Sequence, residues 1–156
     1  MKNYTLFLWI ALLMLGISGT IGAREVTSFN DGWEFKKGPF SKEALQAVQK
    51  WNSDWQEGSI PHTWNADDMQ KQASAFYEGV GYYRKKFTFP ENMEGKRIFL
   101  RFEGVGSYAE VYINGYLAGT HKGAYSAFAC EISSQVKFGK ENEIIVKADN
   151  SSRPDV

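Results

Sequence analysis

The sequence contains very little cysteine, since Cys130 is the only one among 156 residues. A single cysteine excludes the disulfide framework that stabilises many small secreted domains. Cys130 has no histidine or second cysteine at metal-ligand spacing, so we interpret it as a buried thiol and expect no metal site. The chain must therefore be stabilised by packing, which suffices because a domain of this size buries about two thirds of its unfolded surface.

The sequence also lacks an excess of charge of either sign, with 18 basic and 18 acidic residues. Nucleic-acid binding needs a clustered basic surface that neutralises phosphates. The densest basic spot is Lys85-Lys86, which lies in a predicted strand where neighbouring side chains face opposite ways. We therefore exclude nucleic acid as a partner.

Long hydrophobic runs are absent except near the N-terminus. Lys2 is followed by an apolar run from Leu6 to Ile17 and then by a segment rich in small residues that ends at Ala23. A membrane-spanning helix needs about 20 apolar residues, so this shorter run predicts a cleaved signal peptide over residues 1–23. A retained anchor is the alternative. We expect export to a bacterial periplasm or the extracellular space, no membrane association after cleavage, and a single domain over residues 24–156.

Alternation of apolar and polar residues predicts short strands with one buried and one solvated face. The pattern runs through GWEFKK, YYRKKFTF, RIFLRF, SYAEVYIN and EIIVKA. In YYRKKFTF it assigns Arg84 and Lys86 to the solvated face, and Pro90 ends the strand because it cannot donate to a ladder. The other predicted buried positions are Trp33, Phe35, Ile98, Leu100, Phe102, Ala109, Val111, Ile113, Ile144, Val146 and Ala148. This pattern predicts an all-β fold, a jelly-roll β-sandwich.

Two local signals refine this prediction. Asn114-Gly115 favours a two-residue type I′ turn between strands at Tyr108–Ile113 and Tyr116–Lys122. Gly119 in the second of these strands and Gly123 directly after it predict that this strand is bent or lies at a sheet edge. One short helix is predicted near residues 42–51, where Ser41 can cap it and apolar residues recur at helical spacing.

Residues with catalytic side chains are present but form no recognisable pattern. His62 in SIPHTWN and His121 in GTHKGAY lie far apart in the sequence, and we interpret each as ordering its own loop. Glycoside hydrolysis needs two carboxylates across the scissile bond, and the sequence places no two of them face to face. The candidates are Asp67, Asp68, Glu78, Glu103, Glu110, Glu141 and Glu143. We therefore predict no catalytic residue in this chain and no cofactor.

Aromatic residues make up 15% of the chain, and their flat faces suit the C–H face of a sugar ring. Several of them fall in predicted loops or at strand ends. One interpretation is a carbohydrate-binding surface, and the other is a set of core or domain-interface anchors. The residues concerned are Trp55, Trp64, Tyr77, Tyr82 and Tyr125.

Five segments occur in a characteristic order and spacing. They are FNDGWEFKKG, IPHTWN, YEGVGYYRKKFTFP, RIFLRFEGVGSYAEVYINGYLAGTHKGAYSAFACEIS and GKENEIIVKADNSSRPDV. Together they resemble the N-terminal sugar-binding, jelly-roll domain of glycoside hydrolase family 2, the family of β-galactosidases, β-glucuronidases and β-mannosidases. The resemblance covers nearly all of residues 29–156. It implies a galactose-binding-domain-like sandwich and a parent enzyme that hydrolyses terminal β-linked sugars with retention.

The resemblance also implies that catalysis lies elsewhere. The family's two catalytic glutamates sit on a (β/α)₈ barrel that follows an immunoglobulin-like domain. We expect this chain to be truncated before both, to be inactive alone, and to have these missing domains as partners. Asn142-Glu143 is similar to the family's Asn-Glu acid/base pair, but it precedes a terminal strand. We interpret it as a decoy, with Ile144 and Val146 in the core.

The resemblance finally implies a small set of sugar contacts. The family's N-terminal domain lends loop residues to the rim of the sugar pocket, and in some β-galactosidases one is an asparagine three positions before the glycine of a GxGYYR-like segment. The matching residue here is Glu78, a departure from that pattern. With Tyr77 and Tyr82 it forms the predicted substrate-binding set, and carbohydrate is the predicted, weakly held ligand. A free-standing carbohydrate-binding module and a structural domain that docks a partner are the alternatives.

Overall fold

The computed structural model describes residues 24–38, 55–64 and 77–152. The predicted signal peptide at 1–23 and the predicted helix near 42–51 lie outside these ranges. The described elements are β1 (Trp33–Lys37), β2 (Gln56–Gly58), β3 (Val80–Thr88), the 3₁₀ turn η1 (Glu91–Met93), β4 (Phe99–Phe102), β5 (Tyr108–Ile113), β6 (Tyr116–Lys122), β7 (Phe128–Glu131) and β8 (Glu141–Asp149). The predicted all-β sandwich is confirmed.

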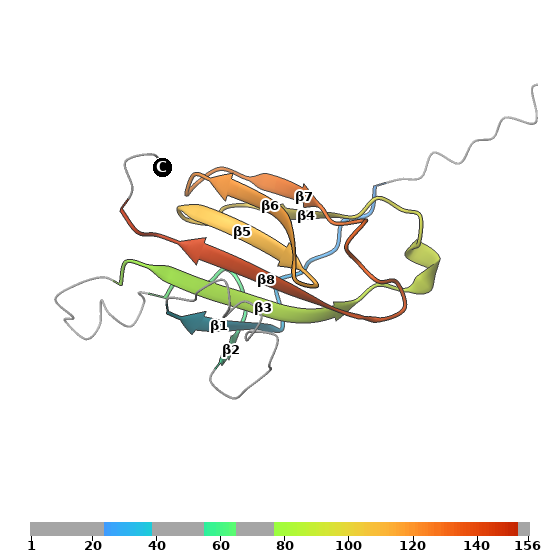
Figure 1. Cartoon of the computed structure of the whole chain (residues 1–156), viewed down its shortest axis with the longest axis horizontal. Helices are drawn as coiled ribbons and strands as arrows, with labels where there is room; N and C mark the ends of the chain where they lie inside the picture. The colour runs from blue at the N-terminus through green and yellow to red at the C-terminus, as the bar shows by residue number, and fades with distance from the viewer. Residues whose placement is uncertain (1–23, 39–54, 65–76, 153–156) are drawn as a thin grey trace, which may run out of the picture.

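The strands form two antiparallel sheets (Figure 1). The larger has the order β2-β1-β3-β8-β5-β6, and the smaller is the β4–β7 pair, which lies against the β5–β6 half of the larger sheet. The central pair is β3 with β8, in register from Val80 opposite Asp149 to Thr88 opposite Glu141. Because β3 ends before Pro90, the predicted strand stop is confirmed.

The main core lies between the two sheets. Val111, Ile113 and Ile144 of the larger sheet are fully buried, and Leu100 and Cys130 of the smaller sheet pack into the same cluster. The period-two pattern assigned the four apolar positions to the buried face, and Cys130 was interpreted as a buried thiol, so both predictions are confirmed. Burial raises the pKa of the Cys130 thiol, as expected for a packed rather than a reactive cysteine.

The β5–β6 hairpin forms at the predicted residues. Asn114 and Gly115 have φ values of 51° and 83°, the left-handed conformations that a type I′ turn requires. The return strand β6 is the edge of the larger sheet, as its glycines predicted. A Cβ at Gly119 would lie 2.5 Å from the Cys130 Sγ atom, so this glycine lets the smaller sheet approach closely.

The predicted solvated face of β3 is wrong at Arg84. This residue is only 1% exposed; its Nε donates to the Glu34 carboxylate at 2.5 Å, and its guanidinium lies 4.1 Å from the centre of the Trp55 ring. Trp55, Tyr82 and Ile145 form a second apolar cluster. The alternation of apolar and polar residues identifies the two faces of a strand, but it does not show whether both are buried. Here the Trp55 ring covers the face that carries Arg84.

A buried asparagine joins three segments at the start of β8. Asn142 is 1% exposed, and its amide bonds the Lys137 N–H and the carbonyls of Lys137 and Lys140. It also accepts a hydrogen bond from Nδ2 of the turn residue Asn114 at 2.9 Å. Asn142 therefore has a structural position, while Ile144 is buried in the core as predicted.

A candidate functional site at the loop end of the sandwich

Four segments meet at one end of the sandwich, where β8 ends and β3 begins (Figure 1). The Asn150 side chain accepts a hydrogen bond from Gly79 N–H at 2.7 Å and donates one to the Tyr77 carbonyl at 3.1 Å. The Asp149 carbonyl accepts from Ser107 N–H, and the Ser107 carbonyl accepts from Gly123 N–H, both at 2.8 Å. These bonds fix a continuous row of loops, which is hereafter the loop end.

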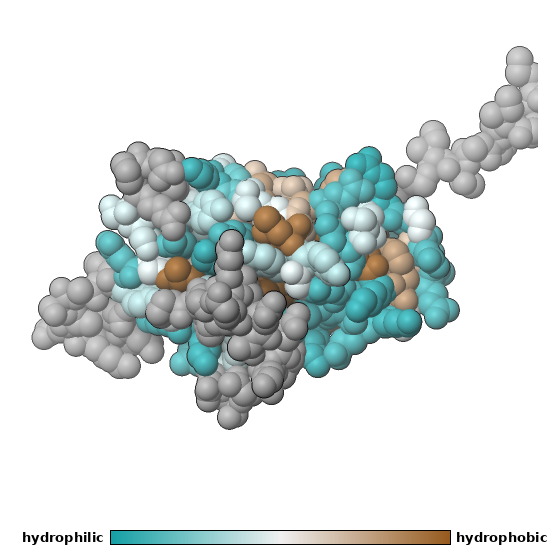
Figure 2. All heavy atoms as spheres, viewed as in Figure 1, coloured by the Kyte–Doolittle hydropathy of each residue, from teal (hydrophilic) through white to brown (hydrophobic). Residues whose placement is uncertain are grey.

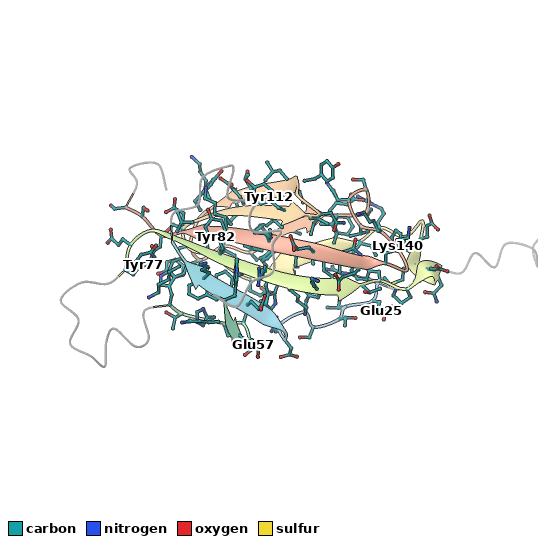
Figure 3. The ribbon with its side chains drawn as sticks, turned by 60° about the horizontal axis from the view of Figure 1, so that its bottom comes forward. Glu25, Glu57, Tyr77, Tyr82, Tyr112 and Lys140 are labelled. Atoms are coloured by element: carbon teal, nitrogen blue, oxygen red, sulfur yellow. The ribbon has the colours of Figure 1, made fainter. Side chains whose placement is uncertain are left out.

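Two of the three predicted sugar contacts lie at this loop end. Tyr77 is half-buried, donates its hydroxyl to the Val80 carbonyl at 3.0 Å, and packs edge-to-face on Trp64 with ring centroids 6.1 Å apart. Glu78 is exposed beside it. Figure 3 shows Tyr77 at one end of the sheet and Lys140 at the other. The geometry thus places an aromatic ring beside an exposed carboxylate at this end of the sandwich.

Tyr82 lies apart from these two residues. It is 1% exposed and belongs to the cluster with Trp55 and Ile145 on the sheet face, where Figure 3 places it near Tyr112. In this position its ring supports the sheet and has no open face for a ligand. Sugar contact by Tyr77 and Glu78 stays a prediction, with Tyr82 beneath rather than on the rim.

The loop end also carries an aromatic residue that the sequence identified only as one of several. Tyr125 is 99% exposed in the loop between β6 and β7. This loop is ordered by a hydrogen bond of 3.0 Å between His121 Nε2 and Ser126 Oγ and by stacking of His121 on Phe128 with centroids 4.2 Å apart. These contacts fit the interpretation of His121 as a loop-ordering residue.

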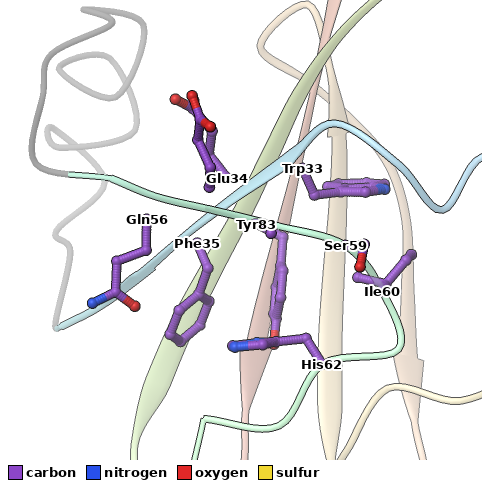
Figure 4. Close-up of a pocket in the computed structure, with 10 residues that line it drawn as sticks. Trp33, Glu34, Phe35, Gln56, Ser59, Ile60, His62 and Tyr83 are labelled. Carbon is purple, nitrogen blue, oxygen red and sulfur yellow. The ribbon is translucent and has the colours of Figure 1, made fainter.

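A small hollow lies beside β1 and β2 (Figure 4). His62 Nδ1 is 3.0 Å from the Tyr83 hydroxyl, and Phe35 packs against both rings. Burial raises the pKa of Tyr83 to about 12, and burial followed by the nearby Lys37 charge lowers the pKa of His62. Both side chains are therefore neutral near pH 7. The hollow has a volume of about 40 Å³, far below the several hundred Å³ of ligand pockets, so it suits water rather than a sugar ring.

Three of the five candidate carboxylates in the described part of the chain are held in ion pairs. Glu141 bonds Lys86 at 2.8 Å, Glu103 bonds Arg101 at 3.0 Å, and Glu110 bonds Lys147 at 3.1 Å. Glu143 is half-buried in β8, and the Asp67-Asp68 pair lies outside the described residues. A carboxylate paired with its own cation, as Glu103, Glu110 and Glu141 are, does not resemble the acid or the nucleophile of a glycosidase.

Glu110 belongs to a compact polar cluster on the outer face of the larger sheet. Burial disfavours its charge, but hydrogen bonds from Tyr112 and Lys147 outweigh burial and hold the pKa of Glu110 below its usual range. The Tyr112 hydroxyl donates to the carboxylate at 2.5 Å. The cluster keeps Glu110 ionised and satisfied, which is a structural arrangement rather than that of a general acid.

Two further features are absent from the part of the chain that the structure describes. No group of three or more histidine, cysteine or acidic side chains there is arranged to hold a metal ion. Within the same ranges, no helix has the length and apolar character needed to cross a membrane. The exposed face seen in Figure 2 is mainly hydrophilic in its described part, with apolar residues in small separate spots. The loop end therefore remains the strongest candidate site.

The sandwich and its loop end define a galactose-binding-like β domain, and comparison with known proteins specifies the family. Residues 35–155 match the model of the glycosyl hydrolase 2 galactose-binding domain-like family. The chain belongs to this family, and the resemblance drawn from the sequence motifs is confirmed.

Similar proteins are much longer than this chain. A β-glucuronidase of Bacteroides fragilis is 34% identical over 155 residues, which are 99% of this chain and 20% of that protein. The crystal structure of a putative β-galactosidase from Bacteroides fragilis is 66% identical with a TM-score of 0.76, covering 86% of this chain and 20% of that one. A Bacteroides uniformis β-glucuronidase structure is 34% identical with the same TM-score, covering 86% and 15%. The chain thus spans about a fifth or less of these relatives.

Proposed function

We propose that this chain is the sugar-binding, non-catalytic domain of an exported family 2 glycoside hydrolase whose parent enzyme cleaves terminal β-linked galactosides or glucuronides. The observation that carries this proposal is the family match over residues 35–155 in a chain that spans only a fifth of relatives named β-glucuronidase and β-galactosidase. The short apolar run at residues 6–17 supports export. The paired state of Glu103, Glu110 and Glu141 supports a catalytic pair located elsewhere in the parent.

Within this function, the loop end is the place where the domain meets the sugar. Tyr77 and Glu78 are held there by the Asn150 side chain, so the rim is fixed before a ligand arrives. Such preorganisation reduces the ordering cost of binding. A ring face and a carboxylate alone make few contacts, so weak binding is expected from the domain by itself.

Tryptophan fluorescence tests this role directly, because Trp64 packs on Tyr77 and reports changes there. Titration of the chain with galactose and with glucuronate should give a saturable change in the millimolar range. Tyr77→Ala and Glu78→Gln should weaken it, while Tyr116→Ala, at the opposite hairpin, should not. A signal that stays flat for both sugars would leave the domain a scaffold and refute its sugar-binding role.

A further inference from the structure

Tyr125 is the most exposed of the large hydrophobic side chains in the described part of the chain. It is 99% exposed, against 69% for Tyr116 and 54% for Leu117. Its neighbours Ala124, Ser126 and Ala127 are small and cannot cover the ring. Of these three side chains, only Tyr125 has its whole ring open to solvent, and tyrosine is enriched in protein–protein interfaces.

The loop that carries Tyr125 is nevertheless well fixed. Gly123 N–H donates to the Ser107 carbonyl at 2.8 Å, and Ser126 bonds His121 at 3.0 Å. Gly123 has a φ of +123°, and a Cβ there would lie 2.9 Å from Ser126 Oγ, so glycine is required for the turn. These contacts hold the backbone of the loop in one conformation, which lowers the cost of ordering the loop in an interface.

The shape around the ring favours a protein socket over a sugar. A sugar platform is a ring that lies flat with hydrogen-bonding groups beside it, whereas a ring exposed on both faces among small residues is a projecting knob. Tyrosines of this kind are typical anchors of protein interfaces, where they fill a pocket on the partner.

The position of the loop indicates which partner. The Tyr125 loop is joined through Ser107 to Asp149, the last residue of β8, so the chain leaves the sandwich beside it (Figure 1). Relatives of this chain are five or more times longer. In a parent of that length, the polypeptide that continues from β8 starts at the same end as Tyr125.

We propose that Tyr125 is an anchor whose ring fills a socket on the remainder of the parent polypeptide and fixes this domain against it. This inference rests on the proposed function, because it requires a parent chain that continues beyond residue 156. The loop end then has two parts with separate tasks: Tyr77 and Glu78 face the sugar, and Tyr125 holds the rim in place relative to the rest of the enzyme.

Hydroxyl-radical footprinting of the parent protein without ligand, read by mass spectrometry, tests the anchor. The structure of this domain alone ranks Tyr125 above Tyr116 in exposure. In the parent we expect the reverse order, with labelling of Tyr125 largely lost and that of Tyr116 retained. Tyr125→Ala should lower the temperature at which this domain unfolds in the parent, whereas Tyr125→Phe, which keeps the ring, and Tyr116→Ala should not.

The outcomes separate this inference from the proposed function. Faster labelling of Tyr125 than of Tyr116 in the parent overturns the anchor, even if the parent hydrolyses β-glycosides. Protection of Tyr125 that disappears on dilution assigns the contact to a second copy and also overturns it. Concentration-independent protection in a parent that hydrolyses no β-glycoside supports the anchor and refutes the proposed function. A gene that ends at Val156 refutes the anchor outright.

Discussion

At the scale of single residues, the most informative side chain is Arg84. The guanidinium is buried between the Glu34 carboxylate and the Trp55 ring, on a face that alternation assigned to solvent. A buried cation is tolerated only when its charge is matched, so Arg84, Glu34 and Trp55 form one unit. The sequence could not reveal this unit, because Glu34 and Trp55 are far from Arg84 along the chain.

Removal of Arg84 should be severely destabilising. Arg84→Ala loses the pair with Glu34 and the packing on Trp55, so we expect a decrease of about 3–5 kcal/mol in the free energy of unfolding. Urea denaturation followed by tryptophan fluorescence measures it. The matched control is Arg101→Ala, because the Arg101–Glu103 pair is 58% and 79% exposed and should contribute about 0–1 kcal/mol. Similar losses in both variants would contradict the buried position of Arg84.

His62 should make stability depend on pH. Its folded-state pKa lies below the ordinary 6.5, first because of burial and second because of Lys37. Between pH 6.5 and the lower folded-state pKa, the unfolded chain therefore binds more protons at His62 than the folded chain does. The contribution of His62 to stability is present above pH 6.5 and is lost as the pH falls from 6.5 through the folded-state pKa. We expect the stability advantage of the native chain over His62→Gln to shrink between about pH 7.5 and pH 5. Urea titrations at both pH values check this, and an advantage independent of pH would contradict it.

At the scale of elements, the β5–β6 hairpin and the start of β8 depend on one another. Asn114 supplies a positive φ for the turn and also bonds the Gln135 carbonyl, the Glu143 N–H and the Asn142 amide. The turn was predictable from Asn114-Gly115, since its requirement is local. The link to Asn142 was not, because a buried amide that joins distant segments leaves no periodic signal.

Asn142→Ala should show that this link is structural. The substitution removes the buried amide that bonds the Lys137 N–H and two carbonyls, so we expect a loss of about 1–3 kcal/mol in the free energy of unfolding. Lys140→Ala is the control, because it keeps the carbonyl that Asn142 uses and should have an effect below about 0.5 kcal/mol. A neutral Asn142→Ala measured by the same urea titration would show that the network is not needed.

The sheets themselves were predictable to a large extent. Ala109, Val111 and Ile113 point inward as a run of alternate positions, and the same pattern recurs in the central strand β8. The sequence did not predict that both faces of β3 are covered, because the cover on the second face is Trp55, which is far from β3 along the chain. Sequence motifs thus specified the family and the core, while the assignment of Tyr82 to the rim failed to anticipate its burial.

At the scale of the whole molecule, the apolar core and the loop end occupy different parts of the sandwich. The apolar contacts lie between the sheets and under Trp55, while the loops that reach outward gather at one end beside the exit of β8. The opposite end is closed by the Asn142 network and the β5–β6 turn. This arrangement agrees with the proposed function, in which the loop end holds a sugar rim in position and another part of the parent protein cleaves the glycosidic bond.

The most direct test of this account is hydrolysis of nitrophenyl β-galactoside and β-glucuronide, measured side by side for the 156-residue chain and for the longer parent polypeptide that the proposed function requires. We predict release of nitrophenol by the parent from at least one of the two substrates and none by the chain alone. Hydrolysis by the chain itself would contradict the account, because it would place a catalytic pair within these residues.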